Sequence, residues 1–198
     1  MADVQNYTHF YGTSDAKVFP ITADSAAAYT CDTGIDVLGI KNFACSPTVE
    51  EQKLTGDGVT METVTKIKEG TFSFECAKTD FQLLATLWGG RYSADDTVNT
   101  FSLQQGDTPK YFQFAVKPEQ IDAALGSAGL HLMKCKINSS SSEGAEDSFN
   151  TVKVSGTMLF TTKTFVRSST DGATSKTAGL MQDYKLYAAD TALSAITT

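Results

Sequence analysis

The chain has 198 residues, 41% hydrophobic and 10% aromatic, which is enough for one domain with a substantial core and short for two. Its formal net charge of −7 disfavours ordinary binding to nucleic-acid phosphates, because like charges repel. The sequence contains no run of about 20 apolar residues, so we expect no membrane insertion of this chain.

Four cysteines are spaced too widely for a Cys-x-x-Cys motif of the zinc-binding or thioredoxin-like kind: Cys31, Cys45, Cys76 and Cys135. Met1-Ala2-Asp3 is polar and acidic, unlike the basic and then apolar start of a signal peptide. We therefore expect four reduced, mostly buried thiols in a protein made in the cytoplasm.

The first 34 residues are rich in Ala, Thr, Ser, Asp and Tyr and show little hydrophobic periodicity. An acidic, weakly patterned segment of this kind predicts an extended N-terminal arm rather than a core element. Such an arm needs a surface to lie on, either its own or that of a neighbouring molecule.

Residues 35–162 carry the strong β signal. Apolar and polar residues alternate over 59–68 and again over 71–76, which is typical of half-buried strands because successive side chains point to opposite faces. Glu69-Gly70 between the two runs predicts a tight turn.

The same alternation predicts strands further along, with apolar faces formed by Phe112, Phe114, Val116, Val152, Val154, Met158 and Phe160. Gly156 falls on the last of these faces and predicts a bulge or a close backbone approach.

One helix interrupts the strands, because four apolar residues have the spacing of a single helical stripe: Phe81, Leu84, Ala85 and Trp88. Thr79 or Asp80 is suited to cap its start, and Gly89-Gly90 is suited to end it in a left-handed turn. We expect these four side chains to pack the helix onto the sheet.

Three later segments lack a strong strand pattern. Pro118 to Leu125 predicts a second, shorter helix, and Ser139–Ser142 with the acidic residues that follow predicts a flexible polar loop. Residues 163–198 turn polar again and predict a C-terminal arm.

Catalytic chemistry has little support in the sequence. The two histidines, His9 and His131, have no sequence context of a catalytic or metal site, and no nucleophile elbow, HExxH helix or Walker loop is present. Gly56-Asp57-Gly58 is interpreted as a turn, because the further carboxylates of a calcium loop are missing. We therefore expect no catalytic residue, no metal site and no cofactor, and a protein that is not an enzyme.

The order of the elements is more informative than any single motif. A strand at Ile35–Phe43 with a Gly and a Lys precedes an acidic polar loop, and then come paired strands and the helix that ends at Gly89-Gly90. Later, Gly129–Ile137 leads to an acidic Ser-rich loop and a closing strand with the step Ser155-Gly156-Thr157. This order resembles the major tail tube proteins of long-tailed, siphovirus-type bacteriophages.

The resemblance covers about residues 35–162 and implies an antiparallel β-sandwich or split barrel with one flanking helix. In that family six copies form a ring, and rings stack into a tube through which the genome leaves the capsid. The implied partners are other copies of the chain, tail terminator, tape measure and baseplate or tip proteins, and double-stranded DNA in transit. The implied location is the virion tail, after synthesis in the host bacterial cytoplasm.

The expected division is therefore an N-terminal arm (1–34), a β-sandwich tube domain (35–162) and a C-terminal arm (163–198). The middle segment is expected to build the ring. The arms and the loop around Ser46–Met61 are expected to join one ring to the next.

Carboxylates facing the lumen of such a tube would repel DNA phosphates, so that the genome slides rather than sticks. The candidate lumen-facing residues are Glu50, Glu51, Asp57, Glu62 and Glu75. The competing interpretation is that they simply lie on the solvated faces of a soluble protein.

Two other classes of function remain open at this point. The first is an inner tube protein of a contractile tail or secretion system, or a capsid decoration protein. The second is a monomeric β-sandwich binding module, which would expose an aromatic platform, whereas the single Trp88 lies on the apolar helical stripe.

Overall fold

A computed structural model describes residues 10–56, 59–78, 80–95, 97–120, 127–143, 151–168, 175–187 and 191–198. Over these residues the fold is mainly β, with antiparallel strand pairing and one helix, which confirms the predicted fold class. In chain order the elements are β1 (Phe10–Asp24), β2 (Tyr29–Cys31), β3 (Ile35–Asp36), β4 (Ile40–Gly56), β5 (Val59–Cys76), α1 (Phe81–Trp88), β6 (Arg91–Ala94), β7 (Asn99–Ser102), β8 (Phe112–Gln120), β9 (Ser127–Glu143), β10 (Thr151–Leu159), β11 (Thr164–Ser168), β12 (Ser175–Gly179) and β13 (Gln182–Tyr187).

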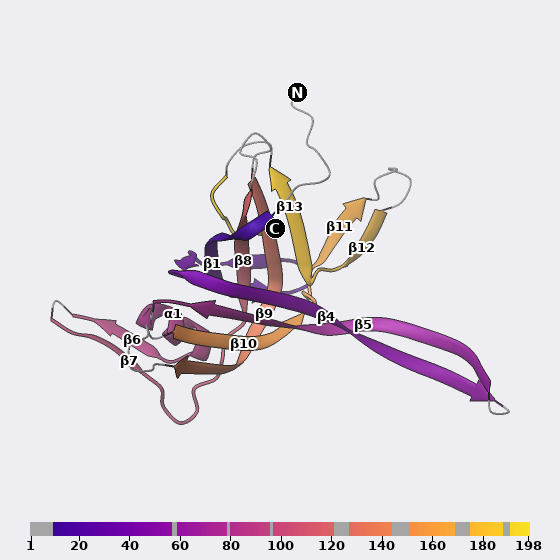
Figure 1. The fold of residues 1–198 in the computed structure, drawn as a ribbon, viewed down its shortest axis with the longest axis horizontal. Helices are drawn as coiled ribbons and strands as arrows, with labels where there is room; N and C mark the ends of the chain where they lie inside the picture. Colours follow the sequence, from indigo (N-terminus) through magenta and orange to yellow (C-terminus); the bar gives the residue numbers. More distant parts are fainter. Residues whose placement is uncertain are drawn as a thin grey trace.

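The main sheet has the strand order β2-β1-β8-β9-β10-β5-β4, with β3 pairing with β1 and β13 pairing with β9. The long strand β9 connects the part of the sheet that contains β1 and β8 with the part that contains β10, β5 and β4. Residues 127–132 of β9 pair with β13, residues 130–135 pair with β8, and residues 134–143 pair with β10. The sheet is curved, and in the described part of the chain the path stays open, with β2 and β4 at its ends (Figure 1).

The core lies on the inner side of this curved sheet. The rings of Phe74 and Phe114 stack with centroids 4.8 Å apart, and the Phe72 ring meets the Phe112 ring edge-on at 5.9 Å. Buried side chains from three of the four predicted alternating runs join this cluster, which confirms their inward orientation: Phe72, Phe74, Cys76, Phe112, Phe114, Val116, Val152, Val154 and Met158. The fourth run, over 59–68, forms a strand as predicted but is not half-buried, because residues 61–68 are exposed. Phe160 lies just beyond the end of β10 and is exposed.

Helix α1 starts and ends as the sequence indicates. The carboxylate of Asp80 accepts hydrogen bonds from the amides of Gln82 and Leu83, and Gly89 ends the helix in the left-handed conformation with φ of 72°. The face that packs inward, however, is turned from the predicted stripe. Leu83, Ala85 and Leu87 are buried and Leu84 and Trp88 pack against the core, whereas Phe81 is exposed.

The predicted turn at Glu69-Gly70 is wrong, because β5 runs through both residues as one strand. Gly70 is buried, and a Cβ atom there would lie 2.5 Å from Cε of Met158 and 2.8 Å from the backbone oxygen of Ser46. Glycine is needed at this position for close packing, not for a change of chain direction.

Gly156 behaves as predicted, since the register between β9 and β10 shifts beside it and a Cβ atom would lie 2.2 Å from the Lys136 carbonyl oxygen. The predicted loop at Ser139–Ser142 is wrong, because these residues are part of β9 and pair with β10. The predicted helix at Pro118 is wrong for Pro118–Gln120, which belong to β8, and the rest of it lies outside the described residues.

The described parts of the two predicted arms belong to the folded body. Strand β1 lies inside the main sheet with Ala16 and Val18 fully buried, so residues 10–24 are a core strand and not an arm. The short apolar side chains of this strand are packed by neighbours from far along the chain, which weak periodicity does not reveal.

The C-terminal stretch is ordered against the same body. Strand β13 extends the sheet beside β9, and residues 191–198 run over the outer face of the sheet with Leu193 and Ile196 buried. Whether any of these segments also contacts other copies of the chain stays a prediction.

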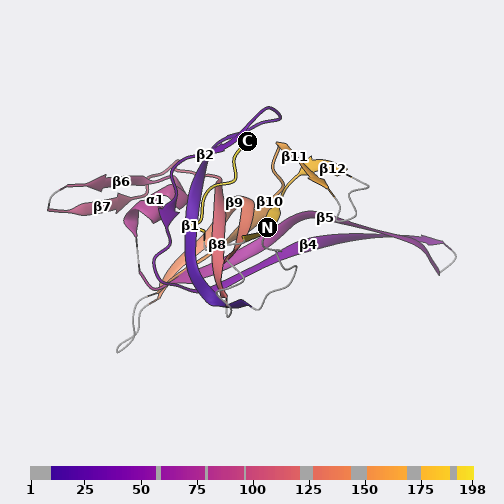
Figure 2. The same ribbon diagram turned by 90° about the horizontal axis from the view of Figure 1, so that it is seen from above.

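Two hairpins extend from opposite ends of the molecule's long axis (Figures 1 and 2). One is the outer part of β4 and β5, and the other is the β6–β7 hairpin beside α1. Among the described helices none has the length and apolar character required to cross a bilayer.

Candidate assembly surface

The outward side of strands β4, β5, β10 and β9 is a largely polar surface, which we call the polar sheet face. The register of these strands places small hydroxyl and amide side chains side by side across all four of them. The face contains Asn42, Ala44, Ser46, Thr48, Glu69, Thr71, Ser73, Glu75, Lys153, Ser155, Thr157, Leu159, Lys134, Lys136, Asn138, Ser139 and Ser141.

Many of its polar groups bond to one another across the strands. The hydroxyls of Ser139 and Ser155 lie 2.7 Å apart, and Nδ2 of Asn138 donates to Oγ1 of Thr157 at 2.8 Å. These bonds hold the paired side chains in a fixed arrangement on a polar surface that can bind water, with the Tyr111 ring at one end beside Lys136.

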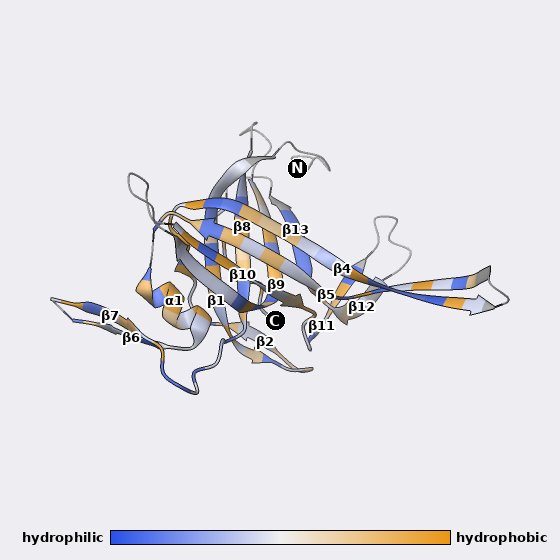
Figure 3. Cartoon of the chain, turned by 60° about the horizontal axis from the view of Figure 1, so that its bottom comes forward, coloured by the Kyte–Doolittle hydropathy of each residue, from blue (hydrophilic) through white to orange (hydrophobic). Residues whose placement is uncertain are grey.

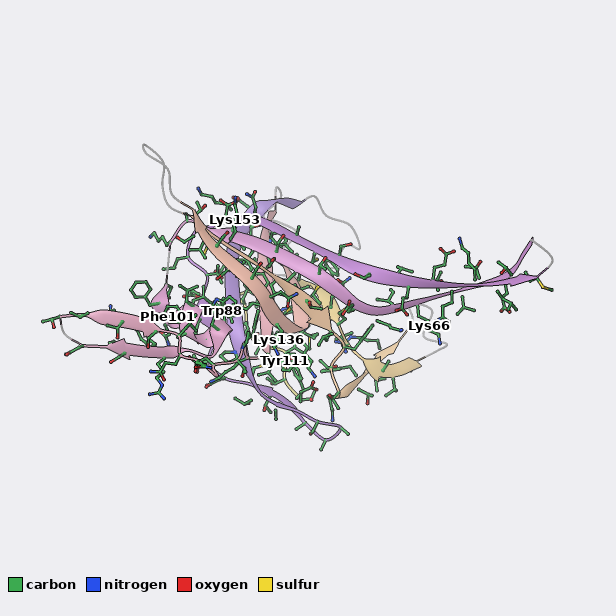
Figure 4. The ribbon with its side chains drawn as sticks, turned by 90° about the horizontal axis from the view of Figure 1, so that it is seen from below. Lys66, Trp88, Phe101, Tyr111, Lys136 and Lys153 are labelled. Carbon is green, nitrogen blue, oxygen red and sulfur yellow. The ribbon has the colours of Figure 1, made fainter. Side chains whose placement is uncertain are left out.

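The charges on this face are balanced between signs. Nδ2 of Asn42 donates to Oε2 of Glu75 at 2.8 Å, and this hydrogen bond, with further contributions from Thr151, Lys153 and Lys41, lowers the pKa of the Glu75 carboxyl. Lys136 lies over the ring of Tyr111, and Figure 4 shows these two side chains together. The carboxylates Glu69 and Glu75 do not outnumber the amines Lys136 and Lys153.

Both outer edges of this four-stranded unit are open in the described part of the chain. Strand β4 pairs only with β5, and residues 136–143 of β9 pair only with β10. Unpaired backbone N–H and C=O groups along an edge are a template for pairing with another strand. Pro47 lies on β4, and sheets tolerate proline on edge strands.

The outer part of β4 and β5, residues 49–56 and 59–67, forms a long two-stranded hairpin beyond the body, which we call the long hairpin. It exposes five apolar side chains, each 43–73% accessible: Val49, Leu54, Met61, Val64 and Ile67. Figure 3 shows apolar and polar residues interspersed along it. The hairpin has no core of its own in the described subunit.

The two faces of the long hairpin differ. The register places Val49 opposite Ile67, and alternation along β5 puts Met61 on the same face. The other face has Leu54 and Val64 among charged residues, including the ion pair of Lys68 with Glu50. Along β4 the more apolar face of the hairpin lies on the same side as the residues that face the core in the body.

The candidate lumen-facing acidic residues do not form one surface. Glu75 lies on the polar sheet face, and Asp57 lies outside the described residues. Glu51 is on one face of the long hairpin, beside Lys53 at 3.5 Å, and Glu50 and Glu62 are on the other face. Their sequence positions carried no signal that separates these locations.

The residues with reactive side chains do not converge on a catalytic site within the described ranges. His131 is buried, and burial lowers the pKa of its imidazole to about 4. The described residues contain no group of three or more His, Cys, Asp or Glu side chains suited to a metal ion, and all four cysteines are free thiols. His9 lies outside the described residues.

Trp88 forms no exposed aromatic platform. Its ring is half-buried against the core, and its Nε1 donates to Oγ of Ser140 at 3.0 Å. Figure 4 shows Trp88 beside Phe101, between α1 and the β6–β7 hairpin.

No protein-family model matches the chain, and no curated protein sequence matches it. Among solved structures, one described as the structure of a type six secretion system protein resembles it with a TM-score of 0.34 and 10% sequence identity, over 90% of this chain and 96% of that chain. A likeness at this level does not establish a family.

Proposed function

We propose that the chain is the repeating subunit of a hollow protein tube of the kind that forms a phage tail, built from stacked rings. The observation that carries this proposal is the four-stranded unit β4–β5–β10–β9 with two open edges. The sequence resemblance to tail tube proteins supports the same function. In this proposal the partners are other copies of the chain and the proteins that start, measure and end the tail.

The two open edges fit one another. Neighbouring strands in the unit run in opposite directions, so β4 at one edge and β9 at the other edge also run in opposite directions. When β4 of one copy lies beside β9 of the next, the pairing is antiparallel, as it is everywhere else in the sheet. Because this contact is head-to-tail, it repeats around a ring and leaves no open edge after closure.

The distribution of bulk supports one orientation of the sheet in the ring. Strands β1 and β8, helix α1 and the core all lie behind the buried side of the four-stranded unit. A closed ring has more room outside than inside, so the bulk lies outside and the polar sheet face lines the channel. A channel lined mainly by hydroxyl groups is suited to letting a long polar molecule pass.

The long hairpin provides the means of stacking. Ring closure runs across the strands, so the strand direction follows the tube axis with the tilt of a barrel. The long hairpin continues β4 and β5 in that direction, beyond the body of its own ring (Figure 1). Its exposed apolar side chains then contact the adjacent ring, where burial stabilises the stack.

Negative-stain electron microscopy of the purified chain at high concentration tests the proposal. We expect smooth hollow tubes made of stacked rings. A chain that stays monomeric at every concentration, by microscopy and by sedimentation, would contradict it.

Hydrogen exchange then locates the contacts. On assembly we expect slower exchange of backbone amides in residues 40–46 and 136–143, the two open edges. Residues 71–76 of β5 serve as the internal control, because they are already paired on both sides. Tubes that form without added protection at either edge would refute the edge-pairing arrangement.

A further inference from the structure

We infer that the channel wall is charge-balanced and hydroxyl-lined, so that a polyanion such as double-stranded DNA passes a hydrated surface that neither binds it nor repels it strongly. This inference rests on the proposed function. It differs from the acidic lumen that the sequence suggested, because it makes the neutrality of the wall, and not its negative charge, the property that prevents binding.

Most of the described acidic side chains proposed for the lumen lie away from the polar sheet face. Of the four proposed lumen residues that the structure describes, only Glu75 lies on the polar sheet face, and Asn42 donates a hydrogen bond to it. Glu50, Glu51 and Glu62 lie on the long hairpin, where the first two form ion pairs with Lys68 and Lys53. The net charge of −7 therefore does not describe the face that lines the channel.

The polar sheet face also carries amines. Lys153 is the direct cross-strand neighbour of Glu75, and Lys136 lies near the other end of the face, with its Nζ over the Tyr111 ring. Lys134 beside them forms an ion pair with Asp24 at 2.6 Å, so its charge is compensated locally. The electrostatic potentials of these neighbouring opposite charges largely cancel in the channel at distances from the wall comparable to the Debye length.

Between these charges the central rows consist mostly of Ser and Thr side chains. Two pairs of side chains are hydrogen-bonded across strands, Ser139 with Ser155 and Asn138 with Thr157. Such groups hold water without carrying charge, and a DNA molecule that slides past them releases no counterions and gains no salt-dependent affinity.

The test uses assembled tubes and a fluorescent 20-base-pair DNA duplex, and it measures the DNA that sediments with the tubes at about 50 mM and 200 mM salt. We expect no retention by the wild-type tubes at either salt concentration. Ser73→Lys adds one positive charge per subunit to the exposed centre of the polar sheet face. We expect its tubes to retain DNA at the lower salt concentration. At the higher salt concentration we expect the amount of DNA that sediments with them to fall at least tenfold.

Thr100→Lys is the matched control, because it adds the same charge to an exposed position of β7, away from the polar sheet face. We expect its tubes to behave like the wild type. Thr71→Lys on the polar sheet face replaces Ser73→Lys if the latter does not assemble, with the same expected result.

Three outcomes overturn the inference. Salt-dependent retention of DNA by wild-type tubes would show that the channel wall is basic. Absence of DNA retention by the tubes of the wall variant, Ser73→Lys or its replacement Thr71→Lys, would show that the wall is acidic. Equal retention by the Thr100→Lys tubes would show that the polar sheet face does not line the channel. If wild-type protein forms no tubes at all, the proposed function fails and this inference fails with it.

Discussion

The same two strands, β4 and β5, pass through two environments. In the body, residues 69–76 of β5 lie between β4 and β10 and bury Phe72 and Phe74, which are 2% exposed. In the long hairpin, β4 and β5 pair only with each other, and Met61 is 73% exposed. Alternation therefore specifies a strand, whereas the burial of its side chains depends on what lies against that strand.

The contrast has a physical consequence. A two-stranded ribbon with exposed apolar side chains and no core gains little stability by itself. The body therefore accounts for the stability of the subunit, and the long hairpin is available for contacts made after folding. The predictions below test this division, from the largest expected effect on subunit stability to the smallest.

The largest effect is expected from the aromatic core. Phe74→Ala removes the ring that stacks on Phe114 at 4.8 Å, and we expect it to lower the free energy of unfolding by about 3–5 kcal/mol. Urea denaturation followed by circular dichroism measures this change. A loss below about 1 kcal/mol would mean that the body is not the stable part of the subunit.

The buried His131 makes the stability of the body depend on pH. Its folded-state pKa of about 4 lies below the ordinary value of 6.5, because burial disfavours the charged imidazole. The unfolded chain therefore binds a proton first as the pH falls. The stability that neutral His131 provides is present above pH 6.5 and is lost between pH 6.5 and 4, up to about 3 kcal/mol.

The test compares the free energy of unfolding of the wild type with that of His131→Leu at pH 7 and at pH 4.5. Neither ring nitrogen of His131 has a hydrogen-bond partner among the described residues, so leucine leaves no bond broken. We expect the wild type to lose about 2–3 kcal/mol more than the variant on acidification. Parallel losses in both proteins would exclude His131 as the source.

The sequence predicted the strands of the body well, because alternation at Phe72–Cys76 and Phe112–Val116 directly reports a half-buried sheet. It failed where the cause lies far along the chain. Gly70 resembles a turn residue, yet its need for glycine comes from Met158 and Ser46. Likewise the Ser139–Ser142 run has the composition of a loop, and only its pairing with β10 makes it a strand.

The candidate site shows the same limit. The sequence identified polar and acidic segments, but it contained no signal for which side chains share a face once the register shifts beside Ile67 and Gly156. A one-residue shift moves side chains to the opposite face, so the distribution of Glu50, Glu51, Glu62 and Glu75 needed the three-dimensional pairing.

An intermediate effect is expected where the C-terminal stretch covers the body. Gln113 is fully buried, its Oε1 accepts from the amide of Ile196 at 2.9 Å, and its Nε2 donates to the carbonyl of Ile196 at 3.4 Å. Gln113→Leu leaves both backbone groups without these bonds. We expect a loss of about 1–3 kcal/mol and faster hydrogen exchange at Ile196.

Gln182→Leu is the matched control for that variant, because the buried Oε1 of Gln182 has no hydrogen-bond partner within the described ranges. We expect its stability to change by less than about 1 kcal/mol. If both variants lose the same stability, side-chain shape rather than the bonds to Ile196 holds the C-terminal stretch in place.

The smallest effect on the subunit, and the largest on assembly, is expected in the long hairpin. Met61→Asp and Ile67→Asp place a charge on its more apolar face, where both native side chains are largely exposed in the subunit. We expect the free energy of unfolding to change by less than about 0.5 kcal/mol, because no core contact is lost.

In the assembled tube the same carboxylates are buried against the adjacent ring, where an unpaired charge is costly. Microscopy and sedimentation are therefore expected to show single rings in place of tubes, with Thr63→Ser on the same face as a control that still forms tubes. Normal tubes from both Asp variants would show that the long hairpin does not join the rings, and a large loss of subunit stability would show that it belongs to the body after all.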